Sequence, residues 1–476
     1  MEIFSEMRKS IRELWLLLPI ANLVGPTACP VALLVATMAF VYLKARRLQS
    51  NTPSSKENSA PRANRMSNSN KNRPPGSWTP SHFTYPPISS YPSEVGNIKP
   101  IPYRPFRWGE YHVTMGIRSM PWDEWIELDN QYEAYHRIRA HRIRTRGEGV
   151  IRVMPDNTGV VQSGAAAAVE LVHELVEYLS RRYPTTFSVT RHSNTTDSTF
   201  GWEGAQPIKT ITVVPLNVTY DVPLSVEEPG AAVRALEVAA LIIQEDLALM
   251  VEGLDGKYYF QAGAICVPGF WRMQDKIGLP LDQIHITGDV PRYKEKLEMS
   301  MERFFQRMTV DKPVVRNNYF FQVIEPKSET NSIDTNVSIR EDKEVDPEEL
   351  AWSESTNGPE DDFIHGHRKP SRPTPGVADL RLRSERQTLR RLPRSGAIVF
   401  TIRTYLTPME DLGREPGVPG RLASALRGWG RDIGIYKGKE RGNWWDALLG
   451  YLDACCDEQL AQGVTAEGAG KEHYPL

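Results

Sequence analysis

An uncharged and largely apolar run occupies residues 14–43, and it restricts how the rest of the chain can fold. A bilayer core is crossed by roughly 20 apolar residues in a helix, and residues 24–43 supply that length. Pro26 and Pro30 fall in the outer turns, where a missing amide hydrogen bond costs least. We therefore predict a transmembrane anchor over residues 24–43, preceded by a short segment, 1–23. A signal peptide is the competing interpretation, but no small-residue cleavage site follows the run.

The residues after the predicted anchor, 44–108, consist mainly of Ser, Asn, Pro and basic side chains, with few aliphatic ones. Such a segment cannot bury enough apolar surface to offset the entropy lost on ordering, so we predict a disordered tether. Basic residues are more numerous after the anchor than before it. The positive-inside rule therefore favours a single-pass membrane protein whose folded body lies in the cytosol.

A second polar stretch divides the body that follows the tether. Residues 325–362 contain thirteen acidic and three basic side chains and show no apolar period. This composition predicts a disordered acidic loop over residues 325–378. The loop separates residues 109–324 from residues 379–460. We expect these two segments to form one domain, followed by a C-terminal tail, 461–476.

Hydrophobic periodicity predicts the secondary structure of this body. Apolar residues at helical spacing predict helices at residues 121–132, 164–182, 230–250 and 292–308, and around 422–426 and 444–452. Stretches rich in β-branched residues or with alternating polarity predict strands at residues 187–190, 211–220, 257–265, 314–324 and 397–404. Because strands and helices do not alternate regularly, the pattern indicates an α+β fold. His173 falls on or beside the apolar stripe of the second helix, and we interpret it as a surface or capping residue.

Composition argues against several classes of function. The formal net charge of −2 speaks against nucleic acid as a main partner, since phosphate neutralisation requires a clustered basic surface. Residues 381–394 hold six arginines but no interleaved aromatic platform, so they give weak support for an RNA contact. The four cysteines, at 29, 266, 455 and 456, have no spacing that suits zinc, an iron–sulfur cluster or a disulfide framework. Such cysteine usage fits a reducing compartment.

Several short motifs carry a family resemblance. They are Gln-Glu-Asp at 244–246, residues 262–271, Asp-Lys-Ile-Gly at 275–278, Ile-His at 284–285, Val-Pro at 290–291, Arg-Asn-Asn at 316–318, and residues 384–397. With these motifs the chain resembles the alpha subunit of the haem-dependent oxidative N-demethylases, a family of PAS-type haem proteins, over most of residues 110–455. It looks like a fungal-type, membrane-anchored member. The resemblance implies a PAS-like antiparallel sheet with flanking helices and a bound haem b.

His285 is the candidate ligand of the haem iron. Imidazole is the usual protein ligand of haem iron, and Phe270 and Trp271 lie upstream of His285 in an apolar stretch that can keep a macrocycle dry. A lone histidine is more often a structural residue, but the position of this one among the family motifs favours ligation. Lys276 is expected to pair with Asp275 or with a haem propionate.

Three residues are candidates for catalysis. Arg316 could bind a propionate or donate a hydrogen bond to dioxygen. Its plain alternative is a structural ion pair with Asp275 or Glu245. Glu245 and Asp246 could hold a cationic amine in a desolvated pocket. Helix capping or an internal salt bridge is the alternative for this acidic pair, and we prefer it slightly.

The resemblance implies an oxidoreductase that uses dioxygen to oxidise a small amine. Members of the family take electrons from NADPH through flavin and an iron–sulfur centre. This chain has neither a dinucleotide-binding glycine fingerprint nor a cysteine cluster, so a separate NADPH-dependent reductase is expected. Two other hypotheses stay open: a haem-based gas or redox sensor without turnover, and a non-haem scaffold in which His285 is structural.

Overall fold

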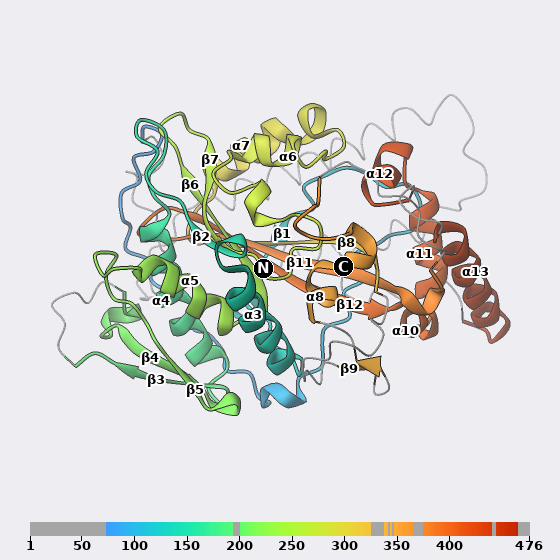
Figure 1. The fold of residues 1–476 in the computed structure, drawn as a ribbon, viewed down its shortest axis with the longest axis horizontal. Coiled ribbons are helices and arrows are strands. Elements are labelled where there is room, and N and C mark those ends of the chain that lie inside the picture. Colours follow the sequence, from blue (N-terminus) through green and yellow to red (C-terminus); the bar gives the residue numbers. More distant parts are fainter. Residues whose placement is uncertain are drawn as a thin grey trace, which may run out of the picture. The chain divides into compact units, whose positions relative to one another are not determined.

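A seven-stranded antiparallel sheet organises the part of the chain that the computed structural model describes (Figure 1). The described residues are 73–193, 200–324, 338–340, 343–344, 347–364, 375–439 and 444–464. In spatial order, the strands are β1 (Arg118–Ser119), β8 (Val314–Val323), β11 (Leu380–Arg391), β12 (Ile398–Pro408), β6 (Glu245–Glu252), β7 (Tyr258–Ala264) and β2 (Ile151–Val153). With helices on its flanks, this sheet confirms the α+β prediction. The predicted strands at 257–265, 314–324 and 397–404 are confirmed as β7, β8 and β12.

The central strands bury both of their faces. In β6, Leu247 and Leu249 join the core cluster on one side of the sheet, whereas Ala248 and Met250 join the cluster on the other. The two sets separate because successive side chains of a strand point to opposite faces. All twelve residues of β11 are buried, since this strand lies between β8 and β12. The two-residue period therefore decides which side chains reach either face.

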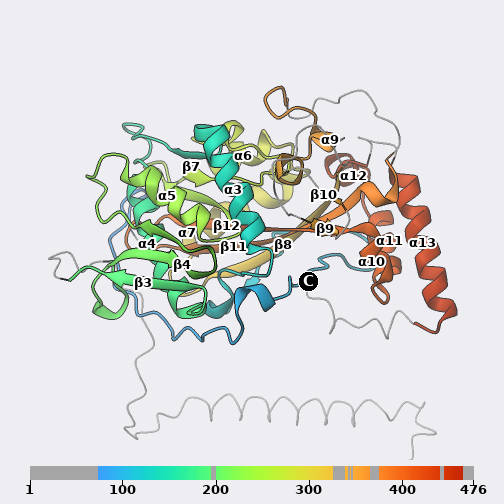
Figure 2. The ribbon, with the colours of Figure 1, turned by 60° about the horizontal axis from the view of Figure 1, so that its bottom comes forward.

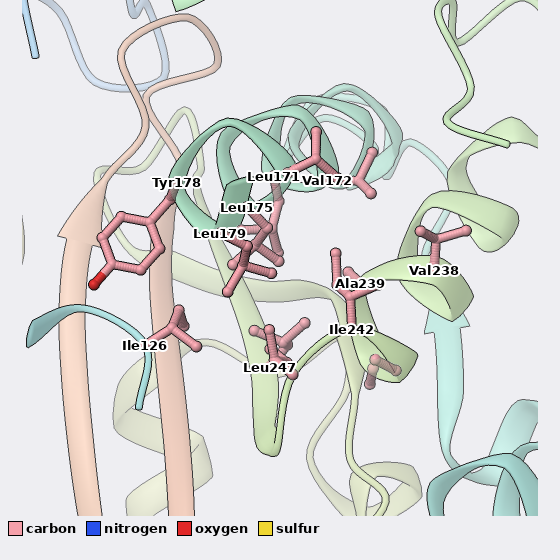
Figure 3. Packing of buried hydrophobic residues seen from close by; sticks show 14 of the residues in the cluster. Ile126, Leu171, Val172, Leu175, Tyr178, Leu179, Val238, Ala239, Ile242 and Leu247 are labelled. Atoms are coloured by element: carbon pink, nitrogen blue, oxygen red, sulfur yellow. The ribbon is translucent and has the colours of Figure 1, made fainter. Parts of the chain in front are cut away.

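Helices α4 (Ala165–Arg182) and α5 (Ala231–Leu241) pack against one face of the sheet, and α3 (Tyr132–Arg146) lies beside α5 (Figures 1 and 2). Leu175 and Leu179 of α4, one helical turn apart, point toward Leu247 in Figure 3. Each leucine buried in this way contributes about 1.5–3 kcal/mol. The predicted helix at 164–182 is confirmed.

Helix α6 (Leu281–Ile286), a π-helical turn (Tyr293–Leu297) and α7 (Glu298–Arg307) pack against the opposite face (Figure 1). Met301 and Phe305 of α7 are buried in the cluster that also contains Met250 and Phe260 of the sheet. The predicted helix at 292–308 is confirmed, with its first turn wound more loosely than an α-helix. This layer forms the wall of the site opposite the sheet.

The C-terminal helices gather at one end of the sheet, at the right of Figure 1. They are α10 (Met409–Arg414), α11 (Val418–Arg427), α12 (Arg431–Tyr436) and α13 (Trp445–Ala461). Their cluster joins Leu422, Leu426 and Leu448 to Tyr319 and Phe321 of β8. The helices predicted around 422–426 and 444–452 are confirmed as α11 and α13.

A three-stranded sheet of β3 (Phe187–Arg191), β4 (Ile208–Val213) and β5 (Val218–Asp221) lies beside α4. The strand predicted at 187–190 is confirmed. The prediction of a single strand over 211–220 was wrong, because the chain turns at Val214–Leu216 and Asn217 takes a left-handed conformation with φ 51°. Pro215, the second residue of that turn, has no amide hydrogen to offer a strand partner.

His173 is buried on α4, so its interpretation as a surface residue was wrong. Its Nε2 lies 2.9 Å from the carbonyl oxygen of Pro223, and its ring stacks on Phe200 at 4.4 Å between centroids. Burial lowers the pKa of His173 to about 4. The residue is therefore a neutral, hydrogen-bonded part of the core.

The tether prediction was wrong for residues 73–108. Tyr85, Tyr103 and Phe106 are buried, and the ring of Tyr85 stacks on Trp202 at 3.6 Å between centroids. Few aliphatic residues are present, so we predicted too little burial for order, but the aromatic residues supply the stabilisation instead. The rest of the predicted tether, the anchor at 24–43 and the segment 1–23 lie outside the described residues. Among the described residues, no helix is long and apolar enough to cross a membrane.

Two helix predictions were wrong in extent. The helix expected at 230–250 ends at Leu241, and residues 245–252 form β6 instead. A strand there removes the conflict between two acids and the negative end of a helix dipole. The helix expected at 121–132 is a 3₁₀ turn, Trp122–Glu124, and α3 begins only at Tyr132. Trp125 and Leu128 between them are nevertheless buried, as their spacing suggested.

The acidic-loop prediction was wrong for residues 347–364. They form α8 (Pro347–Trp352) and α9 (Glu354–Asn357), near the short strands β9 (Ser338–Arg340) and β10 (Lys343–Glu344) in sequence. Trp352 is buried, and Glu360 forms an ion pair with the buried Arg142 at 2.7 Å between Nη1 and Oε2. Acidic residues that find buried arginine partners can order a segment whose composition alone predicts disorder. The remaining part of 325–374 lies largely outside the described residues.

Candidate functional site

A cavity of about 290 Å³ lies between the sheet and the layer formed by α6, α7 and α12. The sheet contributes alternate residues of β6, β8, β11 and β12 to the lining, and the helices contribute His285, Met301 and Tyr436. Most of the lining is apolar or aromatic, with a few polar side chains, as in sites that bind small molecules or cofactors. Among the predicted site residues, Asp246, Phe270, Trp271, Lys276, His285 and Arg316 all line this cavity.

His285 reaches the cavity from α6, and one of its ring nitrogens is hydrogen-bonded to the backbone. Its Nδ1 lies 2.8 Å from the carbonyl oxygen of Leu281. Because a carbonyl can only accept, Nδ1 carries the hydrogen and Nε2 keeps its lone pair. Nε2 has no hydrogen-bond partner among the described residues. Burial lowers the pKa of His285 to about 4, so the ring is neutral near pH 7.

Two aromatic rings fix the orientation of this imidazole. Tyr293 stacks on His285 at 4.8 Å between centroids with an interplanar angle of 11°, and Trp271 meets it edge-on at 5.8 Å. A neutral imidazole with Nδ1 donating to a backbone carbonyl is the form that ligates metals through Nε2. The residues around His285 therefore leave Nε2 as the ring nitrogen with an available lone pair, in a side chain that lines the cavity.

The aromatic wall extends from Phe270, whose ring lies 5.1 Å from that of Phe320 and 6.0 Å from that of Tyr436. The turn before it requires glycine, because Gly269 has φ +67° and an added Cβ would lie 3.0 Å from the ring of Phe320. Arg383 packs within the same tight contact. This packing places Phe270 and Trp271 in the lining of the cavity.

Polar side chains of β8, of β11 and of the residue after α12 form a part of the lining that we call the polar pole: Arg316, Arg383, Glu385, Gln387 and Lys437. The strand register places Gln387 opposite Arg316. Glu385 accepts hydrogen bonds from Nε of Arg383 and Nε2 of Gln387, each at 2.9 Å. The polar pole thus contains one carboxylate among several cationic or neutral donors.

Lys437, directly after α12, is a buried lysine whose pKa lies near neutral pH. Its Nζ donates to Oδ1 of Asn318 at 3.1 Å and to the carbonyl oxygen of Tyr319 at 2.6 Å. Burial lowers the pKa of Lys437 to about 7, although Glu385 opposes this shift and Arg316 adds to it. The lysine is therefore only partly charged at neutral pH.

Arg316 is the predicted site residue with the least support from neighbours. It forms no ion pair with Asp275 or Glu245: Asp275 pairs with Arg272 at 2.8 Å, and Glu245 lies on a different strand face. Burial lowers the pKa of Arg316, and its Nε has no hydrogen-bond partner among the described residues. A buried Nε–H group without a partner can donate a hydrogen bond to a bound ligand.

Asp246 and Glu245 occupy opposite faces of β6. Asp246 lies on the cavity side, but its carboxylate is fully used: Oδ1 binds Nη1 of Arg139 at 2.6 Å and the amide of Cys266, and Oδ2 binds the amide of Val267. The internal salt bridge that we preferred for this residue is present. Its use as an amine-binding group does not agree with this bonding.

Glu245 lies outside the cavity, which contradicts its selection as a catalytic residue. Its oxygens accept the backbone amides of Glu127 and Gln244 at 3.0 and 3.1 Å. Burial raises the pKa of Glu245 to about 7. The residue was expected in the C-terminal half of a helix, whereas it lies on β6, where neighbouring side chains point to opposite faces.

Lys276 lines the cavity behind Trp271 and does not pair with Asp275. Its Nζ donates to Oγ1 of Thr287 at 3.0 Å and lies 4.9 Å from the centre of the Trp271 ring. Burial lowers the pKa of Lys276. The lysine supports the indole that in turn contacts His285.

Sequence reasoning missed Arg383, Glu385, Gln387 and Lys437. The first three occur at alternate positions of β11, so a strand assignment for residues 381–394 would have placed them on one face. Lys437 gives no comparable signal, because its place at the cavity depends on how α12 packs across β8.

The fold and the cavity define a class of protein: an α+β scaffold with one neutral histidine in the lining of an aromatic-walled cavity. Among the described residues, no group of three or more His, Cys, Asp and Glu side chains could hold a metal ion. The family model "Haem-dependent oxidative N-demethylase, alpha subunit-like" matches residues 116–449. The chain belongs to this family, whose name implies dependence on haem.

Proposed function

We propose that this protein is a haem-dependent oxidative N-demethylase-like monooxygenase, which uses dioxygen to oxidise a small amine. The observation that carries the proposal is the free Nε2 of His285, held neutral and facing an apolar cavity. Haem b suits this cavity because His285 offers a ligand to the iron, aromatic side chains offer contacts to the macrocycle, and cations lie at the polar pole. The sheet core of β7, β6, β12, β11 and β8 would then be the PAS-like scaffold that the family resemblance implies.

Each neighbour of His285 has a distinct role in this proposal. The carbonyl of Leu281 holds the hydrogen on Nδ1, which keeps Nε2 available for the iron and raises its basicity. Tyr293 and Trp271 hold the ring plane, and Phe270 excludes water. When bound, the haem supplies the activation of dioxygen, which the protein side chains cannot provide.

Electrons would come from a separate NADPH-dependent reductase carrying flavin and an iron–sulfur centre. The support is the sequence, in which four cysteines have no cluster spacing and no glycine fingerprint for a dinucleotide occurs. We also propose that residues 24–43 anchor the protein in a membrane as a single-pass protein with a cytosolic body. An anchor shared with the reductase would raise the effective concentration of one partner for the other.

The experiment measures oxygen consumption that depends on added amine, with the full-length, haem-loaded protein. NADPH and a supplied reductase provide the electrons, and no dithionite is added. Oxidative demethylation of a secondary amine consumes one dioxygen, two electrons and two protons, and yields a primary amine, formaldehyde and water. We expect formaldehyde to appear in proportion to the oxygen consumed. Oxygen binding without formaldehyde from any small methylamine would favour a sensor and contradict the proposed enzyme.

A further inference from the structure

Buried donors outnumber buried acceptors at the polar pole of the cavity. Nε of Arg316 and Nη1 of Arg383 are both buried and lack a hydrogen-bond partner among the described residues. Lys437 uses two acceptors for three possible donors. In the same region, Oε1 of Gln387 is the unpartnered acceptor that the structure records. A neutral oxygen cannot satisfy this number of cationic donors.

The charge balance points in the same direction. Two guanidinium groups and the partly charged Lys437 face one carboxylate, Glu385, which already accepts from Arg383 and Gln387. Asp246, the other acid of the lining, is neutralised by Arg139. The polar pole is therefore net positive in a largely apolar site, where an uncompensated charge is costly. Such a site favours an anionic group that accepts several hydrogen bonds.

We propose that Arg316, Arg383 and Lys437 form a carboxylate-binding site in the lining of the cavity. Guanidinium and ammonium groups recognise carboxylates through charge-assisted hydrogen bonds. The carboxylate has two possible sources, a haem propionate or an acid group on the amine substrate, and the second source would define the substrate class as amino acids methylated on nitrogen. The naming of these sources rests on the proposed function, whereas the preference for a carboxylate rests on the polar pole itself.

The first arm of the test compares haemin with haemin dimethyl ester, which lacks free carboxylates. Full-length protein free of porphyrin is titrated with each, and binding is followed by the Soret band. If the polar pole holds propionates, haemin binds at least about tenfold more tightly than its ester. In R316Q and K437M, haemin affinity then falls to that of the ester, while ester affinity stays the same.

The second arm compares N,N-dimethylglycine with its methyl ester, by calorimetry on both haem-loaded and porphyrin-free protein. If the polar pole holds a substrate carboxylate, the acid binds at least about tenfold more tightly than the ester, and R316Q removes the difference. The variant R427Q is the matched control, because Arg427 lies on α11 and pairs with Asp453 outside the cavity. It should leave both comparisons unchanged, and circular dichroism should show that all variants are folded.

Discrimination in either arm supports the carboxylate site and assigns its source. Equal affinities for acid and ester in both arms would overturn it, as would discrimination that persists in the R316Q/K437M double variant. Failure of both porphyrins to bind would contradict the proposed function. The dimethylglycine comparison on porphyrin-free protein would still decide the carboxylate site in that case.

Discussion

At the scale of single residues, the hydrogen bond between His285 Nδ1 and the Leu281 carbonyl governs the chemistry of the site. It fixes the tautomer, and burial keeps the ring neutral. The same imidazole exposed on the surface would be partly protonated near neutral pH and less able to bind a metal. Lys437 is similarly tuned by burial, with Glu385 and Arg316 acting on it in opposite directions.

His285 should make the stability of the haem-free protein depend on pH. Its pKa is about 4 in the folded state, against 6.5 for the ordinary residue, so the unfolded chain binds the extra proton first as pH falls. Unfolding free energy should therefore fall between pH 6.5 and 4. Replacing His285 with Asn should weaken this dependence by on the order of 2 kcal/mol, allowing for solvent screening.

Urea unfolding at pH 7.5 and pH 5 checks this expectation. His173 shows the same shift, and Glu170 and Glu245 the opposite one, with pKa values raised to about 7. These residues remain in both proteins, so the difference between wild type and variant isolates His285. An unchanged pH dependence in His285→Asn would contradict a neutral, buried imidazole. The exposed His82 provides the control variant His82→Asn.

At the scale of elements, the alternation along β6 and β11 decides which side chains reach the cavity. Asp246 faces Arg139 on one side of β6, whereas Glu245 contacts backbone amides on the other. Along β11, Arg383 and Glu385 share the cavity face, while Arg386 and Arg390 point away and bind Glu127 and Glu174. The arginine-rich stretch is thus a buried strand that carries ion pairs on both faces.

Substitutions at neighbouring positions of β6 should have unequal effects on stability. Asp246→Asn leaves the fully buried Arg139 without its ion pair at 2.6 Å, and we expect a loss of about 3–5 kcal/mol. Glu245→Gln mimics a carboxyl group whose pKa is already raised to about 7, and we expect a loss below about 1.5 kcal/mol. Denaturant unfolding of the two variants at pH 7 makes the comparison. Equal losses would contradict the distinct partners of the two acids.

Periodicity in the sequence located the elements whose pattern is long and one-sided. It identified α4 and α7, and the strands β7, β8 and β12. It failed at residues 242–246, because an alanine- and leucine-rich helix is followed closely by a strand and both segments are mainly apolar. The same ambiguity placed Glu245 and Asp246 in a helix, whereas both lie on β6. His285 and the aromatic wall were found through family motifs, whereas Lys437 depends on tertiary packing that local patterns do not encode.

At the scale of the whole described unit, distant segments of the chain complete the core. Residues 73–108 run along the body (Figure 2), where Tyr85 donates to Glu174 and Trp78 donates to the carbonyl of Pro393 at 3.0 Å. The segment 347–364 is bound through Glu360 to Arg142 on α3. Composition alone predicted disorder for both segments, because their order comes from aromatic rings and buried ion pairs rather than from aliphatic periodicity.

A chain shortened to begin at residue 109 should therefore fail to fold stably. It loses Tyr85, Tyr103 and Phe106 from the core, and removal of one large buried aromatic side chain costs about 3–5 kcal/mol. Three such losses approach or exceed the 5–15 kcal/mol that stabilises a typical domain. A chain that begins at residue 73 keeps these contacts and serves as the matched comparison. Cooperative thermal unfolding of the chain from 109, at the same temperature as the chain from 73, would contradict this role.

The most direct measurement for the central claim is titration of haem into the full-length, porphyrin-free protein. Wild type and His82→Ala should each bind one haem per chain and develop the same Soret band. His285→Ala should lose or shift this band, and added imidazole should restore it by occupying the vacated ligand position. An unchanged Soret band in His285→Ala, or a wild-type protein that stays colourless with excess haem, would contradict haem ligation by His285.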